Sequence, residues 1–218
     1  DQKLDKIKDL KETFFKVFSQ NYEDGIIDYL IKSLKIDNLK FVEIGTQDYS
    51  ESNTRFLYER YSCDGLIIDG YNNLNREVKK LLKLWKGNLK IHNDYIESSN
   101  IVSVLNKNGF GKDLDLFSID IDGIDYWIIK ELKPKISKIF VAEYNPYFGP
   151  KLQITVPNIK KFNRADYHKS HLCWGLSLNA LVQIMKQKGY TLVGVNDTKT
   201  NAFFVVNEFL NLISLNLP

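Results

Sequence analysis

Hydrophobic side chains along this chain follow two spacings, one typical of amphipathic helices and one typical of strands buried on both faces. Apolar residues recur every three or four positions over Leu4–Phe18 and Ile26–Leu34, which predicts two helices before the first strand. Five short apolar runs then alternate with helical patterns, and two further strands end the pattern. The predicted strands are Lys40–Ile44, Gly65–Asp69, Leu89–Asn93, Leu114–Asp120, Ile136–Tyr144, Tyr190–Val195 and Asn201–Val206. The predicted helices between them are Glu51–Arg60, Asn75–Trp85, Asn100–Asn108, Tyr126–Leu132 and Ser177–Lys188, and Ser50 or Ser52 is available to cap the first of these.

This order of elements predicts an α/β fold with a Rossmann-like, doubly wound sheet of seven strands. The sheet should be mostly parallel, with an antiparallel C-terminal hairpin strand and helices on both faces. We expect residues 1–38 to form N-terminal helices that pack on a core domain of residues 39–218. Residues 145–175 form a connection about twice the usual length, which predicts a substrate loop or lid.

Acidic residues stand where several of the predicted strands end. Glu43, Asp69, Asp120 and Glu143 occupy such positions, and Asp94 follows a weaker strand. Open parallel sheets bind ligands outside the carboxyl ends of their strands. The acids therefore predict one polar site at this edge of the sheet.

The order of elements and several local motifs resemble one enzyme class. Five alternating units with a closing hairpin resemble the class I S-adenosylmethionine-dependent methyltransferases, and Phe41–Asp48 (FVEIGTQD) looks like their first motif. Within that class, Leu116–Trp127 (LFSIDIDGIDYW) is similar to the strand-four signature of FkbM-like methyltransferases, which O-methylate sugars and related hydroxylated metabolites. Glu143–Asn145 and Asn201–Val206 look like patterns of the same group. The resemblance, over residues 40–206, implies an enzyme that uses S-adenosyl-L-methionine and acts on a carbohydrate or another hydroxylated small molecule.

The resemblance also implies a set of cofactor-binding residues. Glu43 and Gly45 would lie at the methionine end, where a glycine lets the backbone approach the ligand closely. Asp69 stands 24 residues after Gly45 and could accept hydrogen bonds from both ribose hydroxyls. Asp94 and Tyr95 would meet the adenine amine and ring face. The polar residues predicted to receive the methionine carboxylate and amino group are Thr46, Gln47, Asp48 and Ser50.

Each of these motifs also has a structural interpretation. Gly45 could serve a strand-to-helix turn that merely needs a glycine. Asp69 begins a segment rich in Gly and Asn, and Asn93 with Asp94 is also good turn chemistry. The sequence leaves these interpretations open.

Three carboxylates, Asp120, Asp122 and Asp125, lie close together after the most buried strand and repel one another unless a cation, a donor or a shared proton offsets the charge. In one interpretation, Asp120 or Asp122 holds Mg²⁺ or Mn²⁺ together with Glu143 and Asn145, which occupy positions analogous to the metal ligands of catechol-type methyltransferases. In a structural interpretation, Asp122 and Asp125 stabilise the start of the next helix.

In the metal-free interpretation, side chains alone carry out the proton transfer. Asp120 would hold the amino group of the cofactor, and Asp122 or His168 would remove the hydroxyl proton. His168 is the preferred base because a lid could deliver it to the site, and Asn145 is placed with Asp122 and His168 among the catalytic residues. A surface histidine without a role is the alternative.

The composition of the chain limits the classes of binding partner that we expect. A net charge of +3 from 30 basic and 27 acidic residues is too balanced to indicate nucleic acid or an anionic membrane. No apolar run is long enough to span a bilayer, and the amino end has no signal-peptide pattern. Cys63 and Cys173 indicate free thiols in a reducing compartment, so we expect a cytoplasmic protein. Because the sequence does not begin with Met, a domain of a longer, multidomain glycan-modifying chain is compatible with it.

Two other functions stay open. A nicotinamide-dependent oxidoreductase would need a G-x-G-x-x-G turn, and the segment Gly45–Ser50 lacks the second and third glycines. A non-catalytic scaffold with a cofactor-binding fold is the third hypothesis.

Overall fold

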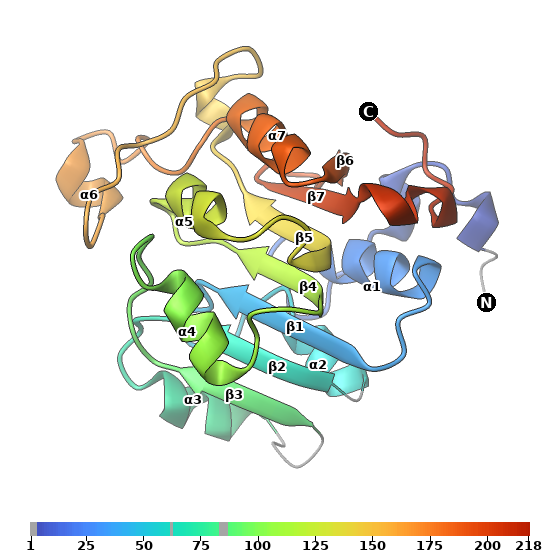
Figure 1. Cartoon of the computed structure of the whole chain (residues 1–218), viewed down its shortest axis with the longest axis horizontal. Helices are drawn as coiled ribbons and strands as arrows, with labels where there is room; N and C mark the ends of the chain where they lie inside the picture. The colour runs from blue at the N-terminus through green and yellow to red at the C-terminus, as the bar shows by residue number, and fades with distance from the viewer. Residues whose placement is uncertain (1–3, 62, 83–86) are drawn as a thin grey trace.

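The protein folds around one seven-stranded sheet with helices on both faces (Figure 1). A computed structural model describes residues 4–61, 63–82 and 87–218. The strands are β1 (Leu39–Ile44), β2 (Cys63–Ile68), β3 (Asn88–His92), β4 (Leu114–Ile119), β5 (Ser137–Glu143), β6 (Tyr190–Val195) and β7 (Asn201–Val206). The α-helices are α1 (Glu23–Ser33), α2 (Arg55–Arg60), α3 (Leu74–Leu81), α4 (Ile101–Asn108), α5 (Asp125–Glu131), α6 (Arg164–Tyr167) and α7 (Leu178–Gln187).

The strand order is β3-β2-β1-β4-β5-β7-β6. Strands β1 to β5 pair in parallel, whereas β7 is antiparallel to both β5 and β6. The predicted fold class is therefore confirmed. Because β7 runs against β5, its first residue, Asn201, pairs with Glu143, the last residue of β5. The start of β7 thus joins the edge at which the parallel strands end.

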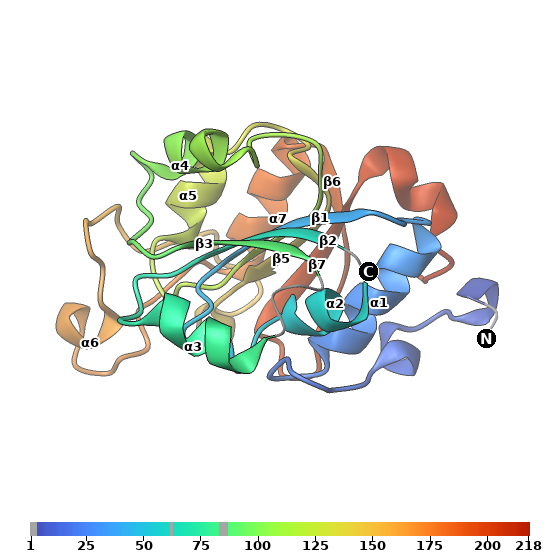
Figure 2. The same ribbon diagram turned by 90° about the horizontal axis from the view of Figure 1, so that it is seen from below.

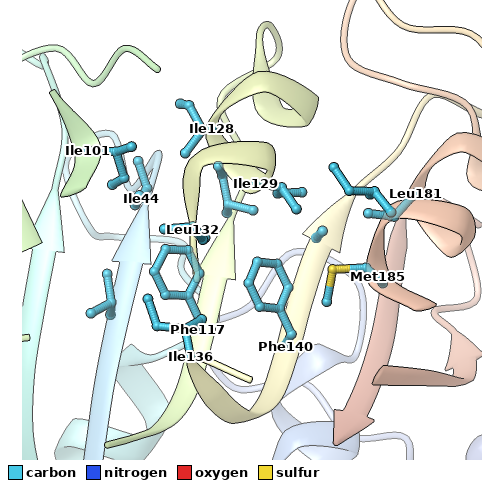
Figure 3. Packing of buried hydrophobic residues seen from close by; sticks show 14 of the residues in the cluster. Ile44, Ile101, Phe117, Ile128, Ile129, Leu132, Ile136, Phe140, Leu181 and Met185 are labelled. Atoms are coloured by element: carbon cyan, nitrogen blue, oxygen red, sulfur yellow. The ribbon is translucent and has the colours of Figure 1, made fainter. Parts of the chain in front are cut away.

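A hydrophobic cluster lies on each face of the sheet, and Figure 2 shows the helices that cover the two faces. Helices α4, α5 and α7 lie on one face, and α1, α2 and α3 lie on the other. Adjacent strand residues point to opposite faces, so Phe117 and Phe140 belong to the first cluster while Leu116 and Ile139 belong to the second. The Phe117 and Phe140 rings stack with centroids 5.0 Å apart (Figure 3). The near-continuous apolar character of β4 is explained by this burial on both sides.

The helix predicted over residues 4–18 is wrong. The segment forms only two 3-10 turns, η1 (Leu4–Lys6) and η2 (Leu10–Thr13). Asp9 caps the second turn with its own side chain. Further on, one carboxylate oxygen of Asp24 accepts hydrogen bonds from the backbone N–H groups of Val17, Phe18 and Ser19. These N–H groups cannot also donate to carbonyls one helical turn earlier, so an extended loop replaces the helix.

The other predicted helices and strands are present, with boundaries that shift by a few residues. The largest shift among the helices that the structure describes to both ends is at α2, which begins at Arg55 instead of Glu51. Helix α3 ends at Leu81, and the last part of its predicted range, residues 83–85, lies outside the described residues. No helix in residues 4–61, 63–82 or 87–218 has the length and apolar character to cross a bilayer. Cys63 and Cys173 are free thiols, as predicted.

The long connection between β5 and α7 carries little regular structure. It contains a 3-10 turn, η4 (Pro146–Phe148), and the short helix α6, which lies beyond the tips of the parallel strands (Figure 1). The Trp127 indole N–H donates to the carbonyl of Val156 at 2.8 Å. Thr155 and Leu176 form an isolated antiparallel bridge. The connection is thus fixed at both ends to the body of the protein, and its middle reaches over the edge of the sheet.

Candidate active site

A cavity of about 320 Å³ opens at the edge where the parallel strands end. The loops after β1, β2, β3, β4 and β5, together with the start of β7, contribute to its lining. The predicted site residues that line it are Glu43, Gly45, Thr46, Gln47, Asp48, Ser50, Asp69, Asp94, Tyr95, Asp120, Asp122 and Glu143. The structure therefore brings the acids from separate strands together around one space, as expected for a sheet of this type.

The backbone conformation and the close packing of the loop after β1 require a glycine at position 45, whether or not a ligand is bound. Its φ of +87° is in the left-handed region, and a Cβ atom placed on it would lie 1.5 Å from the backbone oxygen of Asp120. The N–H of Gly45 donates to the carbonyl of Ile68, and the N–H of Asp120 donates to the carbonyl of Ile44. A glycine here lets the first loop pass directly over the end of β4, and so fixes the floor of the cavity.

Glu43 organises the loop between β1 and α2. The side chain is only 4% exposed, and its two oxygens accept hydrogen bonds from the N–H of Asn53, the N–H of Thr54 and the Thr54 hydroxyl. These bonds satisfy backbone donors directly before α2, which begins at Arg55. The Ser52 hydroxyl accepts the N–H of Arg55, so one of the two predicted cap residues contributes at this helix end. Burial raises the pKa of Glu43 to about 7, and the three hydrogen bonds oppose that shift.

Backbone N–H groups fix the Asp69 carboxylate at the cavity. One carboxylate oxygen accepts the N–H of Gln47 at 2.7 Å, and the other accepts the N–H of Tyr71 at 2.6 Å. Each oxygen keeps a further lone pair, so the carboxylate can still receive a ligand hydroxyl. Partial burial raises its pKa above the usual range, against the effect of these donors.

Tyr95 supplies an open aromatic surface beside Asp69. A Cβ atom at Gly70 would lie 2.8 Å from the Tyr95 ring, so the ring packs directly on that glycine. The side chain is nevertheless 59% exposed, which leaves ring surface available for stacking. Asp94, next to it, is exposed and accepts the N–H of Tyr95.

Asp120 and Glu143 form a carboxyl pair on the opposite side of the cavity. Their side chains lie within hydrogen-bonding reach of each other, and burial together with this neighbour raises the pKa of Glu143 well above its usual value. Burial is also the main reason why the pKa of Asp120 rises to about 7, and the charges of Asp122, Asp125 and Glu43 act in the same direction. Two buried carboxyl groups that interact in this way cannot both ionise easily, so the pair keeps one proton near neutral pH.

The other two acids after β4 have structural partners. Asp125 is fully buried, and its oxygens accept the N–H groups of Ile121 and Gly123, which fixes the turn before α5. Asp122, predicted to be catalytic, has a left-handed φ of +52° and forms an ion pair of 2.7 Å with Arg164 of α6. This ion pair joins the middle of the long connection to the rim of the cavity.

Sequence reasoning missed a contribution from the N-terminal segment. Glu23, the first residue of α1, is fully buried and lines the cavity together with Gln20. One oxygen of Glu23 accepts hydrogen bonds from the side-chain amides of Asn196 and Asn201 at 2.7 and 3.0 Å. The sequence carries no local signal for this cluster, because Glu23 is more than 170 positions from both asparagines.

Two predicted catalytic residues do not line the cavity. Asn145 is fully buried, and its amide nitrogen donates to the carbonyls of Leu172 and Trp174 while its amide oxygen accepts the N–H of Tyr147. His168 is exposed at the end of α6, where its Nδ1 atom lies 2.7 Å from the Ser170 hydroxyl. The predicted metal ligands Asp120, Glu143 and Asn145 are therefore not assembled, because the Asn145 amide serves the loop instead. In the part of the chain that the structure describes, no three His, Cys, Asp or Glu side chains are grouped to hold a metal ion.

The long connection reaches the site through Lys161 and Phe162, which line the cavity. Phe162 lies 3.1 Å from the place that a Cβ atom would take on Gly123. Its ring also packs against Tyr167 of α6, with centroids 5.2 Å apart. Two residues of the connection 145–175 therefore line the cavity, and neither was singled out from the sequence.

The sequence matches no protein-family model and no curated protein. Solved structures are similar to it in fold. The N-terminal domain of EvdMO1 with S-adenosylhomocysteine bound has a TM-score of 0.52 at 9% sequence identity, over 90% of this chain and 92% of that one. The same domain, solved in the presence of S-adenosylhomocysteine and D-fucose, gives a TM-score of 0.51 at 9% identity, with 90% and 91% covered.

Magnesium protoporphyrin IX methyltransferase from Synechocystis PCC 6803, with S-adenosylhomocysteine bound, has a TM-score of 0.51 at 10% identity. That comparison covers 85% of this chain and 82% of the other. These similarities define a class by architecture: the chain has the Rossmann-like fold of S-adenosylmethionine-dependent methyltransferases.

Proposed function

We propose that the protein is an S-adenosylmethionine-dependent O-methyltransferase that acts on a hydroxyl group of a sugar or glycan. The observation that carries the proposal is the cavity at the carboxyl edge of a methyltransferase-like sheet, with the Asp69 carboxylate on one side and the Asp120–Glu143 pair on the other. The fold similarity supports the class. The sugar acceptor is supported by the FkbM-like motif at Leu116–Trp127 and, among similar folds, by the EvdMO1 domain studied with D-fucose.

The residues on the first side of the cavity fit a nucleoside methyl donor. Asp69 has free lone pairs for ribose hydroxyls, and the Tyr95 ring has an open face for adenine. The Thr46 hydroxyl is buried at 1% exposure and has no hydrogen-bond partner, so it is available to a polar group of the methionine moiety. When bound, S-adenosylmethionine supplies an activated methyl group on a sulfonium. We therefore assign Gly45, Thr46, Asp69, Asp94 and Tyr95 to its binding.

We assign the proton transfer to the Asp120–Glu143 pair. The oxygen of the acceptor hydroxyl forms a bond to the methyl carbon while the bond from carbon to sulfur breaks, which leaves S-adenosylhomocysteine. The hydroxyl proton passes to the ionised carboxylate of the pair. A pKa of about 7 for Asp120 suits this role, because a base is most effective when its pKa is near the working pH.

The assigned proton transfer uses the carboxyl pair alone, and the Asn145 amide, the third predicted metal ligand, is hydrogen-bonded to the loop backbone. Turnover should survive dialysis against EDTA. A complete loss of turnover that added Mg²⁺ restores would overturn the metal-free part of the proposal.

Binding of S-adenosylhomocysteine tests the function directly. Calorimetric titration should show binding, and Asp69→Ala should weaken it at least tenfold because two ribose hydroxyls lose their partner. Asp64→Ala is a matched control, since Asp64 is exposed on β2, the strand that Asp69 follows, but lies outside the residues lining the cavity. No binding to the unmodified protein would refute the proposal.

A stronger thermal shift with NAD would instead favour the oxidoreductase, and binding without methyl release to any acceptor would favour a scaffold.

A further inference from the structure

The two sides of the cavity differ in what they offer a ligand. On the side formed by β5 and β7, Glu143 and Asn201 pair across the two strands and both line the cavity. We call these two residues the Glu143–Asn201 pair. Side chains of directly paired residues lie about 5 Å apart at their Cβ atoms. Two neighbouring groups on one small molecule could therefore contact both residues at once.

The orientation of the Asn201 amide is set by its neighbour. Its nitrogen donates to the Glu23 carboxylate at 3.0 Å, so the nitrogen end of the amide is assigned and the oxygen must point elsewhere. That oxygen has no hydrogen-bond partner, although the residue is only 6% exposed. Buried amide oxygens are normally paired. The atom is therefore a vacant acceptor beside the cavity.

The remaining groups on this side also lack donors. Oε2 of Glu143 is buried and accepts no N–H or hydroxyl group, and its polar neighbour is the Asp120 carboxyl. A ligand at this position has to bring hydrogen-bond donors, because the unpartnered atoms there are the Glu143 and Asn201 oxygens, and the one proton of the Asp120–Glu143 pair is kept between its own carboxyl groups.

Charge restricts the ligand further. Ten of the described residues that line the cavity are Asp or Glu, whereas Lys161 is the one Lys or Arg among them. A carboxylate or phosphate on the acceptor would face these acids without a cation to pair with on the β5–β7 side. Repulsion in a partly enclosed cavity is strong, because water screens it poorly there.

We propose that the Glu143–Asn201 pair receives two neighbouring hydroxyl groups of the methyl acceptor, and that the enzyme therefore selects uncharged polyols and excludes acceptors that carry a carboxylate or phosphate. This inference rests on the proposed function and specifies its substrate class. Asn201 is the specificity-determining residue, and Glu143 contacts the hydroxyl that loses its proton to the carboxyl pair.

Matched sugars test the selection. The unmodified protein, saturated with S-adenosylhomocysteine, is examined by saturation-transfer NMR with D-glucose, D-galactose and D-mannose and with the corresponding uronates. At least one neutral sugar should bind, and its uronate should bind at least tenfold more weakly. The inference is overturned if a uronate binds as well as its neutral partner, or if none of the six binds while S-adenosylhomocysteine does. Failure of S-adenosylhomocysteine to bind would overturn the proposed function instead.

Variants test whether Asn201 is responsible for the binding of neutral sugars. Asn201→Ala should raise the Kd of the bound neutral sugar at least tenfold and change the Kd of S-adenosylhomocysteine less than twofold. Asn207→Ala is the control, because Asn207 follows the other end of β7 and is exposed. Equal sugar affinity in Asn201→Ala and the unmodified protein would contradict the role of Asn201. If Asn201→Ala does not fold, the comparison of sugars with uronates on the unmodified protein decides the proposal.

Discussion

The two halves of the sheet edge hold their carboxylates in opposite ways. Over β1 and β2, Glu43 and Asp69 are each bound by backbone N–H groups of the surrounding loops. Over β4 and β5, Asp120 and Glu143 face one another, and next to them the Asn201 oxygen has no partner. The carboxylates of the first half thus have backbone donors, whereas those of the second half do not.

This difference indicates which carboxylates stabilise the fold and which are available for chemistry. A carboxylate that accepts two or three backbone hydrogen bonds fixes a loop and stabilises the fold. Carboxyl groups that meet without donors cost stability, and proteins keep such arrangements where a function requires them. We therefore expect substitutions in the first half to weaken folding and cofactor binding together. Substitutions in the second half should lower turnover with little loss of stability.

The largest effect is expected for Gly45→Ala. The new methyl group would overlap the backbone of Asp120, and the left-handed φ adds about 1–2 kcal/mol. S-adenosylhomocysteine binding should be lost, and the thermal midpoint should fall steeply. Gly109→Ala is the control, because Gly109 has a similar φ of +82° but open space around its Cβ position. Equal losses for both variants would show that conformation alone matters and that the contact with β4 does not.

The next largest effect is expected for Asp120→Asn. Loss of the base should lower kcat by about 10²-fold or more. The thermal midpoint should stay or rise, because repulsion with Glu143 disappears. Asp125→Asn should behave in the opposite way, with a lower midpoint and near-normal kcat of the folded fraction, since Asp125 fixes a turn. If kcat and the thermal midpoint change in the same way in both variants, the assignment of Asp120 as a reactive acid and Asp125 as a structural acid is contradicted.

A smaller effect concerns pH. Burial raises the pKa of Glu43 from 4.5 and that of Asp120 from 3.8 to about 7 in each case. The folded protein therefore binds more protons than the unfolded chain between about pH 4.5 and 7, so the free energy of unfolding should fall as pH rises through this window. The slope should be on the order of 1 kcal/mol per pH unit for each group. Urea unfolding at several pH values measures it.

The controls for the pH experiment come from the same chain. Asp120→Asn should flatten the slope, whereas Asp64→Asn, at an exposed position, should leave it unchanged. A free energy of unfolding that increases from pH 5 to 7 would contradict the buried, proton-holding state of these two acids. Turnover should rise over the same window as the carboxyl pair loses its shared proton.

The smallest effect is expected for Arg164→Ala. Its ion pair with Asp122 is 43% exposed on both sides, and such pairs contribute about 0–1 kcal/mol. Stability should change by less than 1 kcal/mol, while KM for the sugar should rise a few fold because the long connection loses its link to the rim. Lys169→Ala, at an exposed position of the same connection, is the control. An unchanged KM would show that this ion pair has no part in closing the cavity.

Local patterns in the sequence were sufficient to predict the sheet. The alternation of apolar runs with helical spacing reports burial directly, so the seven strands and the antiparallel hairpin were all expected. The N-terminal helix failed because its outcome depends on Asp24, which competes for the backbone N–H groups of residues 17–19. That competition is invisible in the spacing of apolar side chains.

The site was predictable only in part, for a similar reason. Topology alone places Glu43, Asp69, Asp120 and Glu143 at one edge, so their convergence could be expected. Whether a side chain faces the cavity or serves a loop depends on contacts distant in sequence. The Asn145 amide is occupied by carbonyls 27 and 29 positions away.

The antiparallel placement of β7 has a consequence for the order in which the site is synthesised. The edges of β1, β2, β4 and β5 are all encoded before residue 144, whereas Asn201 belongs to the last strand. Chains emerge from the ribosome from the N-terminus onward. The residues that we assign to the methyl donor are therefore synthesised first, and under the proposed function a nascent chain can select an acceptor only when its final hairpin has closed.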